Sequence, residues 1–260
     1  SNTDEERIAD IHEMFANPKI DGILCARGGY GCTRIATKLD YNLIKNNPKV
    51  LVGFSDITVL HQAIYAETGL VTFHGPVGST LEGDYSINQF KEVLMNPKNK
   101  LKIHNAEVSD EHKEDPVYDR YTITDGVAQG KLVGGNLSLI VALVGTPHEI
   151  DFTNKIVCIE DIEEAPYRID RMLTQLIEGK TFSKAAGILF GVSDGCNSSS
   201  NPKSFSLKEV LLDRLKPLNI PTVYGMSMGH VPDNFTFPIG IEAKLNTSKM
   251  TLKLMENAVV

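Results

Sequence analysis

The sequence predicts an α/β protein, because strand-like and helical segments alternate along its first part. Short apolar runs typical of strands occupy residues 20–26, 50–54 and 70–73, and segments with helical apolar spacing lie before and between them. Such alternation indicates a parallel sheet with helices on both faces and with ligand sites at the carboxyl ends of its strands. We therefore expect a Rossmann- or flavodoxin-like parallel-sheet domain at residues 1–86.

The first predicted element of this domain is a helix. Thr3 and Glu6 have the spacing of a capping box, and Ile8, Ile11 and Phe15 follow on one helical face. An α/β domain that opens on a helix indicates a strand further upstream. We therefore expect the first strand of the sheet, and the native N-terminus with any signal peptide, to lie outside this sequence.

The alternation changes in the second part of the chain. Residues 87–124 are polar and charged, and we interpret them as a connector between domains. Residues 125–260 return to apolar segments, which predict a mixed α/β domain. The predicted features are strand-like patches at 101–103 and 121–123, strands at 126–133, 155–159, 186–190 and 221–224, helices after Asn136 and Pro166, an exposed loop at 197–201 and a hairpin at 243–255.

Composition and charge restrict the classes of partner. The chain has 260 residues, 42% of them hydrophobic, and a formal net charge of −7 without a basic run, which argues against a nucleic-acid or anionic-membrane partner. No apolar run reaches the ~20 residues that span a bilayer. The 4 cysteines form no C-x-x-C pair. A reducing, cytoplasmic compartment fits this pattern best.

Ser55 occupies the most informative position, between the apolar run at residues 50–54 and a helix that ends at Gly69. A serine at such a corner projects its hydroxyl beside the unpaired amides of the first helical turn, which suit an oxyanion. This is the physical basis of a nucleophile elbow. Serine followed by Asp56 is also a common way to begin a helix, so a simple N-cap remains the alternative.

A serine nucleophile needs a base, and the base needs an orienting carboxylate. His74 and His230 each follow a predicted strand, whereas His61 lies nearly two helical turns beyond Ser55. Glu160 begins an acidic turn after another strand. Each feature also has a structural interpretation, since such histidines are often structural and acidic residues favour a helix N-terminus.

The acidic turn and a glycine-rich turn leave further alternatives open. The acidic turn could supply oxygen ligands for magnesium, although the spacing of its acidic residues defines no ligand set. These residues are Glu160, Asp161, Glu163 and Glu164. The turn Arg27-Gly28-Gly29-Tyr30-Gly31 matches neither a dinucleotide nor a P-loop motif. Its glycines instead allow backbone amides to approach a substrate closely.

Six separated motifs together resemble one family of serine peptidases. They are ARGGYG at 26–31, GFSD at 53–56, HGPV at 74–77, GGNLSLI at 134–140, IEDIEEAPYRIDRML at 159–173 and GMSMGH at 225–230. On these motifs the chain resembles the murein LD-carboxypeptidase family, which also includes the microcin C immunity peptidases. The resemblance covers nearly the whole chain.

The resemblance implies a triad of Ser55 as nucleophile, Glu160 as acid and His230 as base, divided between two domains of a homodimeric enzyme. It implies that the enzyme hydrolyses the L,D amide bond of murein tetrapeptides and so releases the terminal D-alanine. This reaction belongs to the recycling of cell-wall peptidoglycan. No cofactor or metal is implied.

The implied reaction needs further groups around the triad. Backbone amides of Asp56 and of Gly28 or Gly29 would hold the oxyanion. Arg27, Tyr30 and Arg168 are the candidates for substrate binding, with Arg171 as a further candidate for the free carboxylate, because arginine binds carboxylates bidentately.

Three alternatives to this function follow from the same residues. The first is an immunity-type peptidase that cleaves an aminoacyl-nucleotide amide; the absence of tryptophan from the chain favours the murein branch over it. The second is a non-catalytic module that binds a small ligand. The third is a metal-assisted hydrolase that uses the acidic turn.

Overall fold

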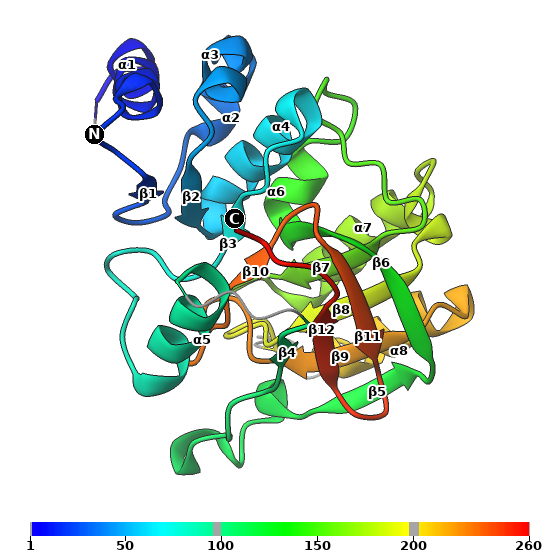
Figure 1. Cartoon of the computed structure of the whole chain (residues 1–260). Coiled ribbons are helices and arrows are strands. Elements are labelled where there is room, and N and C mark those ends of the chain that lie inside the picture. The colour runs from blue at the N-terminus through cyan, green and yellow to red at the C-terminus, as the bar shows by residue number, and fades with distance from the viewer. Residues whose placement is uncertain (1, 96–99, 198–202, 260) are drawn as a thin grey trace.

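A computed structural model describes residues 2–95, 100–197 and 203–259 of the chain. Its first sheet has the strand order β1-β2-β3-β10. The strands are β1 (Gly22–Leu24), β2 (Val50–Gly53), β3 (Phe73–His74) and β10 (Phe237–Pro238). β1, β2 and β3 are parallel, and β10 joins β3 in antiparallel orientation from far along the chain (Figure 1). The predicted parallel α/β arrangement is confirmed.

Short-range signals mark the start of the first helix in this part of the chain and the end of the last. They are α1 (Asp4–Ala16), α2 (Cys32–Ile35), α3 (Tyr41–Asn46) and α4 (Thr58–Thr68). The Thr3–Glu6 capping box is present, with Glu6 N–H donating to Thr3 Oγ1 at 3.2 Å. Gly69 ends α4 with φ 72°. The strand predicted from residue 70 begins later, because Leu70 N–H donates to Thr68 Oγ1 (3.0 Å) and belongs to the helix end.

The second sheet has eight strands in the order β4-β12-β11-β6-β7-β8-β9-β5. The central strands β6 to β9 are parallel, and the outer strands pair antiparallel, so the mixed domain is confirmed. The predicted hairpin is β11–β12. The strands are β4 (Lys102–Ile103), β5 (Tyr121–Thr124), β6 (Val127–Asn136), β7 (Ile156–Glu160), β8 (Gly187–Gly191), β9 (Thr222–Met226), β11 (Glu242–Asn246) and β12 (Thr251–Leu254).

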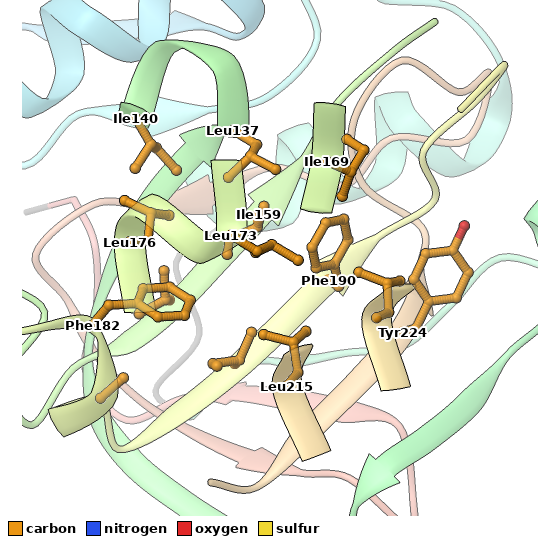
Figure 2. Close-up of a cluster of buried hydrophobic side chains, with 14 of the residues drawn as sticks. Leu137, Ile140, Ile159, Ile169, Leu173, Leu176, Phe182, Phe190, Leu215 and Tyr224 are labelled. Atoms are coloured by element: carbon orange, nitrogen blue, oxygen red, sulfur yellow. The ribbon is translucent and has the colours of Figure 1, made fainter. Parts of the chain in front are cut away.

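Alternate residues of the central strands face two different cores, because side chains alternate across a strand. Val157 and Ile159 face one core, which α6 (Leu137–Ala142), α7 (Pro166–Ile177) and α8 (Leu207–Leu215) cover. Figure 2 shows this core, with Leu173 of α7 and Leu215 of α8 among its labelled side chains. As predicted, Asn136 caps α6 by accepting from Leu139 N–H at 3.2 Å.

A helix that the sequence analysis did not predict begins before the predicted connector and extends into it. This helix is α5 (Asp84–Leu94). It packs against the second core, which lies on the opposite face of the central strands, through Tyr85, Phe90, Val93 and Leu94. Ile87, Phe90 and Leu94 have helical apolar spacing, a signal that the sequence analysis did not use. The short 3-10 helices are Ala36–Lys38, Ser55–Ile57, Asp110–His112, Pro116–Tyr118, Phe182–Lys184 and Lys216–Leu218. Most of the loop predicted at 197–201 lies outside the described residues.

Helix α4 joins the two sheets. Gln62 Nε2 donates to Gly134 O at 2.7 Å, and Asn136 N–H donates to Thr58 Oγ1 at 3.0 Å. A Cβ on Gly135 (φ 141°) would lie 2.5 Å from Thr58 Oγ1, so only glycine permits this close approach. The contacts fix the carboxyl end of β2 relative to the carboxyl ends of β6 and β7. Within the described residues, no helix has the length and apolar character needed to cross a membrane.

Candidate active site

Ser55 has a strained backbone at the corner between β2 and α4. Its φ is 62°, in the left-handed region that a non-glycine residue rarely adopts. Phe54 precedes the 3-10 turn Ser55–Ile57, and Ile57 precedes α4, so Ser55 caps neither helix. An N-cap residue would have extended backbone angles. The geometry therefore favours an elbow over the N-cap alternative, since such strain, of order 1–3 kcal/mol, concentrates at functional sites.

The glycine-rich turn lies directly against Ser55. A Cβ on Gly28 would lie 2.8 Å from Ser55 Cβ and 3.1 Å from Ser55 Oγ. The buried carboxylate of Asp56 joins the two segments, because its Oδ2 accepts from Cys32 N–H at 2.9 Å. Sequence analysis assigned Asp56 a role only through its amide. The structure adds a second role, in which its side chain holds the start of α2 beside the corner.

Glu160 and His230 form a buried hydrogen-bonded pair. Glu160 ends β7 and is fully buried, and its Oε2 lies 2.7 Å from His230 Nδ1. A carboxylate only accepts, so Nδ1 carries the proton, and Nε2 of a neutral ring is left as an acceptor. A Cβ on Gly229 would lie 2.7 Å from Glu160 Oε2, which explains the glycine before the histidine.

The ring of His230 lies next to the serine corner. Its centroid is 4.7 Å from the ring centroid of Phe54, the residue that precedes Ser55. Nδ1 is occupied by Glu160, and Phe54 contacts the ring. The structure thus brings together three segments that are separate in the sequence, the ends of β2 and β7 and the segment after β9.

The protonation of His230 follows from two opposing effects. Burial lowers the pKa of its ring, whereas the hydrogen bond and the negative charge of Glu160 raise it. Asp161 and Asp194 raise it further, and the resulting pKa lies above the ordinary histidine value. His230 therefore loses its proton at a higher pH than a free histidine does.

Comparison with known proteins decides the family. Residues 1–75 match the LD-carboxypeptidase N-terminal domain, and residues 129–245 match the LD-carboxypeptidase C-terminal domain. This chain belongs to the LD-carboxypeptidase family. The resemblance inferred from the six motifs is confirmed.

Relatives in this family carry two kinds of name. Probable murein peptide carboxypeptidase of Bacillus subtilis is 42% identical, over 95% of this chain and 76% of that protein. Microcin C7 self-immunity protein MccF of Escherichia coli is 27% identical, over 98% of this chain and 80% of that protein. Among solved structures, the crystal structure of muramoyltetrapeptide carboxypeptidase from Oxalobacter formigenes matches with a TM-score of 0.81 and 30% sequence identity. The match covers 97% of this chain and 82% of the Oxalobacter chain.

The other histidine candidates lie deeper in the protein. His74 is fully buried and stacks on Phe237 at 4.7 Å, and burial lowers its pKa well below the ordinary value. His61 is buried with Nε2 2.8 Å from Gly53 O, at the end of β2. His61 and His74 are therefore buried packing residues near the Ser55 corner. His230 is the candidate that is hydrogen-bonded to the Glu160 carboxylate.

The predicted substrate-binding residues fall into two places. Arg27, Gly28, Gly29 and Tyr30 line one cavity of about 980 Å³, and the Tyr30 side chain is 81% exposed. Arg168, on the first turn of α7, instead contacts its neighbours. Its Nη1 lies 3.3 Å from Glu164 Oε2, and its Nε donates to Tyr167 Oη at 3.2 Å.

Two side chains of the acidic turn, those of Asp161 and Glu164, pair with other groups of the protein. Asp161 is buried and accepts from Asn136 Nδ2 (3.1 Å), from Ser138 N–H (3.0 Å) and from its hydroxyl (2.8 Å), which ties β7 to the start of α6. Glu164 pairs with Arg168. In the part of the chain that the structure describes, no group of three or more histidine, cysteine or acidic side chains could hold a metal ion. The described geometry therefore gives the metal-assisted alternative no ligand set.

Proposed function

We propose that this protein is a serine carboxypeptidase that hydrolyses the L,D amide bond of murein tetrapeptides and releases the terminal D-alanine, a step of peptidoglycan recycling. One observation carries the proposal. The strained Ser55 corner lies beside a histidine whose Nδ1 is 2.7 Å from a fully buried glutamate. Membership of the LD-carboxypeptidase family supports the same substrate class.

In this proposal His230 Nε2 takes the proton of the Ser55 hydroxyl, and Ser55 Oγ attacks the carbonyl carbon of the L,D amide. The protonated His230 then gives its proton to the leaving amine, and the C–N bond breaks. Water, deprotonated by the same ring, hydrolyses the acyl-enzyme and frees Ser55. Glu160 keeps the proton on Nδ1 and stabilises the imidazolium that forms in each half of the reaction.

The oxyanion of the tetrahedral intermediate needs donors next to Ser55. We assign this role to the backbone amides of Asp56 and of Gly28 or Gly29. The contact between Gly28 and Ser55 supports the assignment, and so does the position of Asp56 in the first turn after the strand. The cavity beyond them, with Arg27 and Tyr30 on its lining, is the proposed site of the substrate carboxylate. Arg168 on α7 is the second candidate for that carboxylate.

We further propose a cytoplasmic homodimer, with residues 1–86 carrying the nucleophile, residues 125–260 the acid and base, and residues 87–124 the connection. Free thiols at all four cysteines are consistent with a reducing compartment. Sedimentation of the protein at micromolar concentration tests the dimer: a single species at the monomer mass contradicts it.

A substrate panel tests the proposed function. We expect D-alanine release from a soluble L-Ala-D-Glu-diaminopimelate-D-Ala tetrapeptide or from its lysine counterpart, and no release of D-alanine from a D,D-linked pentapeptide end. Preferential cleavage of an aminoacyl sulfamoyl adenosine would instead assign the chain to the immunity branch, which the MccF relative represents. Tight binding of these compounds without turnover of any of them would favour the binding module.

A further inference from the structure

The segment that carries His230 has no regular secondary structure. Residues 227–236 connect β9 to β10, and His230 lies within them. We call residues 227–236 the histidine loop. A side chain on such a segment is positioned by contacts of the loop rather than by a strand or helix.

Two hydrogen bonds close the histidine loop on itself. Asn234 is buried, and its Oδ1 accepts from the N–H of Gly229, the residue before His230, at 3.2 Å. Phe235 N–H donates to Ser227 O at 2.9 Å and joins the two ends of the loop. Asn234 thus acts on the backbone immediately next to His230.

Ser86 connects the histidine loop to another part of the molecule. It lies in the first turn of α5 and is fully buried. Its hydroxyl donates to Pro232 O at 2.9 Å and accepts from Asn234 N–H at 2.9 Å. One hydroxyl therefore satisfies both a carbonyl and an amide of the loop. Residue 86 lies outside both ranges that match the LD-carboxypeptidase domains.

We propose that Ser86, together with Asn234, is a positioning residue that holds the histidine loop so that His230 stays aligned between Glu160 and Ser55. The proposal rests on the proposed function of His230 as the base. Glu160 and Phe54 contact the ring of His230. Among the described residues, the hydrogen bonds to the loop backbone at Pro232 and Asn234 come from Ser86 instead. Hydrogen bonds of Ser227 with Asn105 and Ala106 hold the start of the loop. The later part, after His230, is held by Ser86 of α5.

The polarity of Ser86 supports positioning rather than packing alone. Packing of a small buried side chain requires only apolar contact, whereas loss of this hydroxyl leaves a carbonyl and an amide buried without partners. The loop can then recover hydrogen bonds only by moving toward water, and it would carry His230 with it. Misplacement of a reacting group by about 1 Å costs roughly 100-fold in rate.

Ser193 offers a matched control for the test. It is also a fully buried serine and follows β8, but its hydroxyl has no partner among the described residues. Ser86→Ala and Ser193→Ala therefore remove the same atom from equally buried positions. Only the first change removes hydrogen bonds to the histidine loop.

The experiment measures kcat and KM for D-alanine release from the tetrapeptide at a temperature well below unfolding. We expect Ser86→Ala to lower kcat roughly 10- to 100-fold with KM changed less than about twofold, because alignment rather than binding is lost. Ser193→Ala should keep the wild-type kcat. Equal kcat values for the two folded variants would overturn the proposal. A fall in melting temperature alone, with kcat retained, would also overturn it.

Two further measurements keep the test decisive. If Ser86→Ala does not fold, Asn234→Ala and Asn234→Asp replace it, and we expect Asp, which keeps the acceptor for Gly229 N–H, to retain more activity than Ala. The downfield proton resonance of His230 Nδ1 gives a readout without substrate. We expect it to broaden in Ser86→Ala through faster exchange with water, and an unchanged resonance contradicts positioning. If the wild type releases no D-alanine, the proposed function fails, but this resonance still tests the loop contacts.

Discussion

The corner that carries Ser55 and the loop that carries His230 are built in different ways. Ser55 lies between a strand and a helix that are adjacent in the sequence. Its unusual conformation is local to its own backbone, where φ is 62°. His230 lies in an irregular loop, and its position depends on Glu160, on Ser86 and on Phe54, all of them far away in the chain. The proposed nucleophile is thus positioned by local structure and the proposed base by tertiary contacts.

This difference predicts how the two regions respond to substitution. Changes at the corner should act through backbone strain and close contacts, with effects confined to Ser55. Changes around the loop should act through charge and hydrogen bonds that reach His230 from other elements. The following variants separate these two modes of action, beginning with the largest expected effect.

Glu160→Gln tests the tertiary support of the base. We expect kcat to fall by about 10³- to 10⁴-fold, because the amide neither stabilises the imidazolium nor fixes the proton on Nδ1. The base must be neutral, so kcat/KM rises with pH through the pKa of His230. Glu160 raises that pKa, so this limb should move to lower pH in the variant.

Glu178→Gln, an exposed change at the end of α7, is the matched control and should keep the wild-type pH profile. The measurement is kcat/KM for the tetrapeptide between about pH 5 and pH 9, a range chosen to include the ordinary histidine pKa. A limb that stays at the same pH in Glu160→Gln contradicts the assignment of His230 as the titrating base.

Gly28→Ala tests the contact at the corner. The new Cβ would come within 2.8 Å of Ser55 Cβ, so either the turn or Ser55 must shift. We expect kcat to fall by roughly 100-fold. Gly22→Ala is the control on the same segment, because its Cβ would meet Val50 at an ordinary 3.5 Å. Equal activity of the two alanine variants would remove Gly28 from the proposed oxyanion site.

Asp56→Ala tests how the glycine-rich turn is held. The change leaves Cys32 N–H without its carboxylate partner in a buried position, and we expect a loss of about 1–3 kcal/mol in the free energy of unfolding. Urea denaturation measures it, with the exposed Asp21→Ala as control, which should stay within about 0.5 kcal/mol of the wild type. A loss no larger than in the control contradicts this role for the Asp56 side chain.

The smallest expected effect isolates the strain at Ser55. Ser55→Gly and Ser55→Ala both lack the hydroxyl, but glycine adopts a positive φ without the cost that alanine pays. We expect the free energy of unfolding to be about 1 kcal/mol larger for the glycine variant than for the alanine variant. If alanine is the more stable of the two, Ser55 is not strained in solution.

The same difference explains what could be predicted from the sequence. The Thr3–Glu6 capping box, the Asn136 cap and the end of α4 at Gly69 depend on neighbouring residues, and all three were predicted. So was a corner at Ser55. Separate strand ends were identified for Glu160 and His230, but only the family resemblance joined them, because residue spacing does not encode a contact across 70 positions.

Helix α5 was missed although Ile87, Phe90 and Leu94 have helical spacing, because the polar residues between them led to the interpretation as a connector. Other features gave no usable signal in the sequence, and the buried Ser86 looks like any surface serine. The carboxylate of Asp56 is hydrogen-bonded to an amide 24 residues earlier, which no local pattern reveals. Asn234 acts on a loop without periodicity. These residues share one property: their partners are set by the tertiary fold.

The most direct test of the account is D-alanine release from the tetrapeptide by the wild type and by Ser55→Ala, with the circular dichroism of both proteins compared beforehand. We predict release by the wild type and a loss of at least about 10³-fold in kcat for a variant with wild-type secondary structure. Comparable release by a folded Ser55→Ala would contradict the account, because it would show that Ser55 is not the nucleophile.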